Sequence, residues 1–210
     1  MNRVLVAGVV IAGLVAGVAA AYMFTRARAA APVLEQATLF TEPRPLPAFT
    51  LADQAGHPFG PEQLQGHWTF VFFGFVNCPD ICPTTLATLA AARQALEDLP
   101  VGKRPAVAFV SVDPGRDTPA VLGQYVAHFD PAFVGATGTR EAIDALTRAL
   151  GVAVIIGPAS ADGSYAVDHS AAIFLVDPAA RVVALFGAPH EAGAIARDYR
   201  RVVGAQDDAT

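Results

Sequence analysis

Charged residues are scarce in this chain of 210 residues. They make up 16% of it, and hydrophobic residues make up 53%. An average soluble domain is roughly 25% charged, and a disordered chain combines low hydrophobicity with high net charge. The composition therefore excludes disorder, and the length suits one ordinary domain with an appendage.

Basic residues are also few, and Lys103 is the only lysine. Lysine and arginine together number 14, against 19 aspartates and glutamates, which gives a formal net charge of -5. Arg3, Arg26 and Arg28 precede every acidic residue, so the remainder of the chain carries 11 basic and 19 acidic groups. A body that acidic excludes nucleic acid as a partner, because phosphate contacts need basic patches.

The N-terminal segment Val4–Phe24 contains no charged residue over 21 positions. As a helix rising ~1.5 Å per residue it would span roughly 31 Å, about the hydrocarbon thickness of a bilayer. We therefore expect one transmembrane helix within residues 1–28, which form a membrane anchor. The alternative is a cleaved signal peptide, whose apolar core is usually only ~7–15 residues long. Under either interpretation, we expect the rest of the chain to lie outside the cytoplasm.

Residues 29–47 contain four prolines and predict an extended tether, residues 48–205 predict one folded domain, and residues 206–210 a tail. Strand and helix patterns alternate within the domain. The predicted strands are 49–52, 58–60, 69–75, 106–112, 133–136, 152–156, 171–176 and 181–187, and the predicted helices are 84–99, 118–129, 139–150 and 190–203. This order predicts an α/β sandwich with a mixed central sheet, which is the thioredoxin-like arrangement.

Cysteine is rare, but Cys78 and Cys82 lie where chemistry is expected. They join the end of a buried strand to the start of a helix, and ligands bind at such strand ends. Pro83 fits the first helical position, which places Cys82 near the N-cap and predicts an easily ionised thiol. The short spacing lets both sulfurs meet, either in a disulfide or on one metal ion. A purely structural disulfide is disfavoured, because closing so small a loop contributes little stability.

Two cysteines alone do not complete a structural zinc site, which takes four ligands, whereas soft thiolates suit Cu(I). Among five histidines, His169 lies just before the strand 171–176. In a thioredoxin-like fold the loop at that point lies against the cysteine loop. The residues alone leave a reversible dithiol and a metal site open. The other histidines are interpreted as surface or capping residues: His57, His67, His128 and His190.

Three blocks of sequence resemble the Sco/SenC family of copper-binding assembly factors. They are residues 73–86 (FGFVNCPDICPTTL), 111–119 (SVDPGRDTP), and 165–170 with 173–178 (YAVDHS and IFLVDP). The resemblance implies a thioredoxin-like domain anchored by a single helix in the bacterial inner membrane, with its C-terminal domain in the periplasm. It also implies that Cys78, Cys82 and His169 hold one copper ion, as Cu(I) or Cu(II).

The resemblance further implies a copper chaperone that helps to mature the copper A site in subunit II of cytochrome c oxidase. The alternatives are a thiol–disulfide oxidoreductase that keeps the cysteines of that site reduced, through a redox-active Cys78–Cys82 pair, and a copper or redox sensor. Such oxidoreductases usually have two residues between their cysteines, not three. The copper donor and the thiol reductant stay open. Asn77 and His67 depart from the usual residues of the family.

Acidic residues flank these motifs. Asp80, between the cysteines, is interpreted as a turn residue, with contact to a partner as the alternative. Asp168 precedes the histidine and would orient the loop or bond to the ligand. We expect Asp113, Arg116 and Asp117 to form an internal ion pair and a helix cap at the end of a neighbouring strand, with Asp117 or Thr118 as the capping residue.

Overall fold

The computed structural model describes residues 11–20, 33–160 and 163–207, and the chain divides into two compact units between Val33 and Leu34. In the first unit, residues 11–20 are helical, and the rest of the predicted span Val4–Phe24 lies outside the described residues. No helix within the described residues combines the length and the apolar character that crossing a membrane requires.

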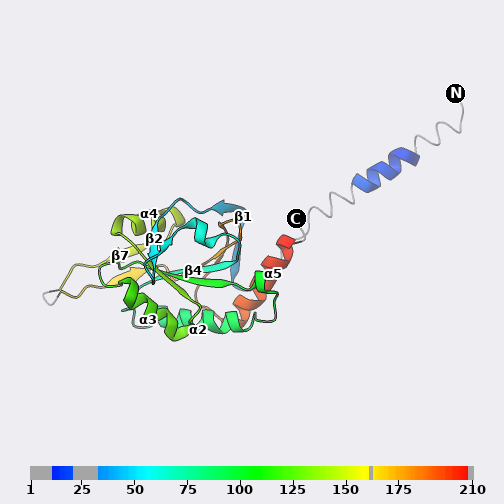
Figure 1. The fold of residues 1–210 in the computed structure, drawn as a ribbon. Helices are drawn as coiled ribbons and strands as arrows, with labels where there is room; N and C mark the ends of the chain where they lie inside the picture. Colours follow the sequence, from blue (N-terminus) through cyan, green and yellow to red (C-terminus); the bar gives the residue numbers. More distant parts are fainter. Residues whose placement is uncertain (1–10, 21–32, 161–162, 208–210) are drawn as a thin grey trace, which may run out of the picture. The chain divides into compact units, whose positions relative to one another are not determined.

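A mixed sheet of eight strands forms the centre of the second unit, as far as that unit is described (Figure 1). The bounds are β1 Ala37–Pro45, β2 Leu51–Asp53, β3 Pro58–Phe59, β4 Thr69–Gly74, β5 Ala106–Ser111, β6 Val134–Thr137, β9 Ile173–Val176 and β10 Arg181–Phe186. The order across the sheet is β1-β10-β9-β4-β5-β6-β2-β3. β4, β5 and β6 run parallel, whereas β9 is antiparallel to both β4 and β10. The predicted α/β class with a mixed central sheet is confirmed.

Helices cover both faces of this sheet. Figure 1 shows α2 (Ile81–Gln94) and α3 (Pro119–Phe129) on one face and α4 (Arg140–Leu150) on the other. The last helix, α5 (Ala192–Asp207), contacts α2. The 3₁₀ turns Pro61–Leu64 and Val101–Lys103 complete the helical elements of the described residues in this unit. The sandwich therefore has three layers, and loops follow the C-terminal ends of β4 and β5.

The ends of α3 and α4 follow from local chemistry. The hydroxyl of Thr118 accepts the Val121 N–H at 3.4 Å, and that of Thr139 accepts the Ala142 N–H at 3.2 Å. These bonds satisfy N–H groups that have no partner inside the helix. α4 stops at Gly151, whose φ of +72° costs glycine little because it has no Cβ.

Helix α2 begins earlier than the sequence predicted. The prediction placed Pro83 in the first helical position, but the helix begins at Ile81. Pro83 is therefore its third residue, and Cys82 lies inside the first turn instead of at the cap. Proline is tolerated there because the first four N–H groups of a helix lack a partner within it. The helix also stops at Gln94, before its predicted end, and turns continue over residues 95–98.

Part of the predicted tether 29–47 is a strand of the sheet. Residues 37–45 form β1, which pairs with β10 at the sheet edge. The register shifts between Leu39 and Arg44, so the residues between them bulge out of the ladder. Pro43 and Pro45 fit here because the outer side of an edge strand needs no N–H donor. The proline signal that suggested a tether is thus equally compatible with an edge strand.

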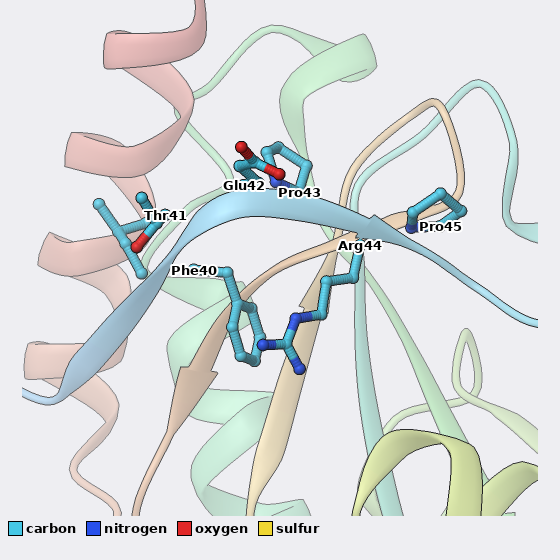
Figure 2. A pocket seen from close by; sticks show the side chains of 7 residues that line it. Phe40, Thr41, Glu42, Pro43, Arg44 and Pro45 are labelled. Atoms are coloured by element: carbon cyan, nitrogen blue, oxygen red, sulfur yellow. The ribbon is translucent and has the colours of Figure 1, made fainter.

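A hollow of about 590 Å³ follows the bulge of β1 and is lined only by residues of that strand (Figure 2). Within it, the Arg44 guanidinium lies over the Phe40 ring, 4.8 Å from the ring centroid. The hollow shares no residue with the cysteine segment. The hollow therefore belongs to the irregular edge strand and not to the cysteine segment.

The hydrophobic core is built around β4, all six of whose residues are buried. Successive side chains of a strand point to opposite faces of a sheet. Phe70 accordingly packs edge-on against Phe186, and Phe73 packs edge-on against Phe174. The aromatic run thus fills the core on both faces and fixes the end of β4 where the cysteine loop begins.

A buried carboxylate fastens the start of the folded unit to α5. Asp198 is fully buried and accepts three successive backbone N–H groups, from Glu35 (2.9 Å), Gln36 (2.7 Å) and Ala37 (2.9 Å). Its charge is matched by Arg201 at 3.1 Å. Because these N–H groups belong to the first residue of β1 and the two residues before it, the carboxylate holds the start of the edge strand in place.

Replacing Asp198 with alanine should lower the free energy of unfolding by roughly 2–4 kcal/mol, because partly buried N–H donors lose a charged acceptor. Denaturant unfolding can be followed by the fluorescence of Trp68, which is buried. The matched control is Asp98→Ala. It breaks an exposed ion pair with Arg200, which lies on α5 as Asp198 does, and it should cost less than about 1 kcal/mol. Equal losses in both variants would contradict the assigned role of Asp198.

Candidate metal centre

The sheet topology brings the cysteine loop and the predicted histidine together. β4 ends at Gly74, and the loop that follows carries Cys78 into α2. β9 runs antiparallel to β4, with Ile173 opposite Phe72. The residues just before β9 therefore lie beyond the end of β4, where the cysteine loop begins. His169 is in that segment.

His169 lies on a strand and not in the predicted loop. Residues 167–169 form β8, which pairs antiparallel with β7 (Val154–Ile156) in a separate two-stranded ribbon, with His169 opposite Val154. The sequence predicted a strand over 152–156 but no partner for it. The ribbon therefore fixes the position of the backbone that carries the imidazole.

The three predicted ligand atoms lie within 4.8 Å of one another. The Sγ of Cys82 is 3.2 Å from Nε2 of His169, and the Sγ of Cys78 accepts the backbone N–H of Cys82 at 3.4 Å. Both cysteines are free thiols. Cys82 is fully buried, whereas Cys78 and His169 are half-buried. The group therefore has a closed inner end and an open outer edge.

The imidazole is oriented to offer a lone pair to the cysteines. Nδ1 of His169 lies 3.0 Å from the carbonyl oxygen of Ser170, and a carbonyl only accepts, so Nδ1 carries the hydrogen. Nε2 of the neutral ring is then the acceptor that faces Cys82. Burial lowers the pKa of His169, although the bond to Ser170 and the charge of Asp168 oppose the shift. A neutral imidazole is the form that binds metals.

The expected ease of ionisation of Cys82 is not found. Burial raises the pKa of this thiol, and the nearby Cys78 adds to the shift, while a bond to the Phe75 backbone opposes it. The reason is the early start of α2, which draws Cys82 into the core below the cap. A metal that binds here must displace a proton, because the ligand is the thiolate.

Gly74 makes room for Cys82, a role that the sequence analysis missed. A Cβ at this position would lie 2.7 Å from the Sγ of Cys82 and 2.7 Å from a ring carbon of Phe109. Real Cβ atoms do not come so close to such neighbours. A glycine that ends a buried strand directly before a cysteine loop is the signal that marks this close approach.

Charged residues behind the site form the predicted ion pair. Asp113 is fully buried; Arg116 donates to one of its oxygens, and the Tyr165 hydroxyl to the other. The guanidinium of Arg116 also lies over the Tyr165 ring, 3.8 Å from its centroid. Since Tyr165 is two residues before β8, this cluster ties the histidine strand to the end of β5.

Asp117 ties the cysteine loop to the same strand end. Its carboxylate accepts the Ser111 hydroxyl at 2.6 Å and the Val76 backbone N–H at 3.1 Å. Thr118, not Asp117, caps α3. The charged turn therefore holds both halves of the candidate site from behind.

The remaining predicted residues lie as follows. Asp80 is exposed at the N-cap of α2 without a side-chain capping bond, and Asp168 is exposed on β8. Within the described residues, only His169 joins the two cysteines in a group that could hold a metal ion. The other histidines lie elsewhere: His57 contacts Asp53, His128 packs on Phe129, His190 bonds to the Ala171 carbonyl, and His67 is half-buried before β4.

Fold and site together define a class: a thioredoxin-like α/β domain with two thiols and one imidazole beyond the end of a central strand. Two sulfurs and one nitrogen form a soft donor set, which suits copper. In the described part of the chain no fourth ligand completes the set that structural zinc takes.

Comparisons identify the family. The profile of the SCO1/SenC family matches residues 41–204. A putative copper-binding protein of Stutzerimonas stutzeri is 40% identical over 151 residues, which cover 70% of this chain and 72% of that protein. The human mitochondrial SCO1 homologue is 34% identical over 160 residues, covering 73% of this chain but only 53% of that protein. The structure of Arabidopsis thaliana ScoI with copper bound superposes with a TM-score of 0.70 at 33% identity, covering 75% of this chain and 98% of that one.

The chain therefore belongs to the SCO1/SenC family, as the sequence blocks predicted.

Proposed function

We propose that this protein is a membrane-anchored copper chaperone that delivers copper to the copper A site in subunit II of cytochrome c oxidase. The observation that carries the proposal is the convergence of Cys78, Cys82 and His169 within 4.8 Å. Copper is the cargo, and these three residues are its proposed ligands. Two thiolates hold Cu(I), and the imidazole adds the nitrogen that Cu(II) prefers.

The half-open site supports transfer over permanent binding. Cys82 is closed off from solvent, while Cys78 and His169 retain exposure at one edge. An incoming ligand can thus displace the outer two before the inner one. A resident metal is usually enclosed by its full set of ligands, as in structural zinc sites.

Membership of the family supports the oxidase as the target. The Sco family is described as one of cytochrome c oxidase assembly proteins. The uncharged run Val4–Phe24 supports an anchor in the bacterial inner membrane, and we propose a periplasmic position for the second unit.

A thiol–disulfide oxidoreductase is the second candidate. It is favoured by the hydrogen bond from the Cys82 N–H to the Cys78 Sγ, which brings the two thiols together. The imidazole lone pair directed at Cys82 favours the metal site, because a disulfide has no use for this ligand. A reduced protein that binds no copper yet rapidly reduces disulfides would replace the chaperone proposal with this one.

The test is a strain that lacks the gene and expresses either this chain or its Cys78→Ser/Cys82→Ser variant. We expect the variant strain to make an oxidase that keeps its haems but lacks the near-infrared absorption of copper A. His57→Ala, which changes a histidine outside the site, is the control and should restore the absorption. A full copper A signal in the double-variant strain would overturn the proposal.

A further inference from the structure

We propose that the rim of the cysteine–histidine cleft is the docking face for the protein that exchanges copper with this chain. The partner that fits it presents basic side chains around a small apolar contact. This inference rests on the proposed function and specifies the partner of the same site.

The approach to the ligands is confined to one cleft. A cleft of about 220 Å³ is lined on one side by Cys78, Pro79, Asp80 and Ile81, and on the other by residues of β8, including Asp168 and His169. Cys82 has no exposed surface. A partner that brings its own thiolates to the copper must therefore contact the rim of this cleft.

The rim is unusually apolar. In the described part of the second unit, five large hydrophobic side chains are exposed; Ile81 lines the cleft, and Ile155 and Ile156 lie on β7, the strand that pairs with β8. Ile81 is 45% exposed beside Cys82, while Ile155 and Ile156 on β7 are 65% and 41% exposed. Ile155 and Ile156 pair in register with Asp168 and Val167, which line the cleft. Exposed apolar groups gathered at one place mark an interaction site.

The same rim is acidic. Asp80 and Asp168 lie on opposite sides of the cleft and are exposed, and neither forms an ion pair with a basic residue in the described parts of the chain. Arg116, which lies behind the site, is already engaged, since it pairs with Asp113. Two uncompensated carboxylates favour a partner with lysine or arginine at matching positions. They disfavour a nucleic acid or an anionic lipid surface.

The transfer step is a ligand exchange without a redox change. Copper leaves the thiolates of Cys78 and Cys82 and the imidazole of His169 as Cu(I), and binds the thiolates of the partner. Protons displaced from the acceptor thiols end on Cys78 and Cys82, so charge and mass balance. Docking at the rim would bring the two sets of thiols into reach of the same ion.

The experiment measures Cu(I) transfer from the full chain in detergent to the reduced, copper-free copper A domain of subunit II. We expect Asp80→Asn/Asp168→Asn to slow transfer roughly three- to tenfold at low salt and to converge with the wild type at high salt, where surface charges are screened. Ile81→Ser/Ile155→Ser should slow transfer at all salt concentrations. Transfer to a small Cu(I) chelator, which needs no docking face, should be slowed much less than transfer to the copper A domain in every variant.

Matched controls come from two residues beyond the C-terminal end of α2, a helix of 14 residues that is about 21 Å long. Glu97→Gln removes an exposed charge, and Val101→Ser removes an exposed apolar side chain. Both should transfer copper at the wild-type rate. Equal rates in rim and control variants would overturn the docking face while leaving the proposed function intact. Wild-type transfer to the chelator but not to the copper A domain would refute the proposed target, and this inference with it.

Discussion

Replacing Cys82 with alanine should abolish high-affinity binding of both Cu(I) and Cu(II). The variant removes the innermost of the three donor atoms, the one that lies 3.2 Å from the His169 nitrogen. Residues that only orient ligands typically change metal affinity 10–100-fold. We therefore expect a loss above about 100-fold, measured by competition with a chelator of known affinity, and the same result for Cys78→Ala.

The control separates loss of a ligand from loss of the fold. Thr85→Ala changes another buried side chain in the first turns of α2 and should leave copper affinity within a factor of a few. Circular dichroism should show that Cys82→Ala keeps its helices, because a small side chain replaces a thiol without adding volume. Retention of wild-type affinity by Cys82→Ala would remove this residue from the site.

The second large effect is expected at His169, and it should differ between the two oxidation states. Cu(I) is soft and is satisfied by two thiolates, whereas Cu(II) prefers nitrogen and oxygen ligands. His169→Ala should therefore keep appreciable Cu(I) binding through the cysteines. It should lose stable Cu(II) binding together with the thiolate-to-Cu(II) charge-transfer absorption, which visible spectroscopy detects.

His128→Ala is the matched control for this prediction. His128 is exposed on α3, so its removal tests whether a surface imidazole accounts for any Cu(II) signal. The control should retain the full absorption. An unchanged Cu(II) spectrum in His169→Ala would show that the imidazole is not a ligand.

Elements with strong local signals could be predicted from the sequence. The aromatic run of β4, the threonine caps of α3 and α4, and the glycine that ends α4 each encode their structure locally. Prolines were less informative, because they fit both a tether and an edge strand, and the structure makes residues 37–45 the strand β1. The pairing of β7 with β8 depends on contacts between distant residues and left no local pattern.

The residues of the candidate site could be predicted from the sequence, but the burial of each residue could not. Their places near strand ends singled out Cys78, Cys82 and His169, the resemblance to the Sco/SenC family implied that they form one ligand set, and the topology of β4 and β9 brings them together. The burial of Cys82 was not foreseen, since it depends on α2 beginning at Ile81. The effect of burial on the Cys82 thiol outweighs that of the helix N-terminus. The pKa of this thiol is therefore raised, and the prediction that it is lowered was wrong.

X-ray absorption at the copper edge tests the central claim most directly. The reduced full chain, loaded with one equivalent of Cu(I), should show two sulfur ligands and one nitrogen ligand per copper, and His169→Ala should show two sulfurs without that nitrogen. A wild-type spectrum without sulfur ligands, or one that His169→Ala leaves unchanged, would contradict the account.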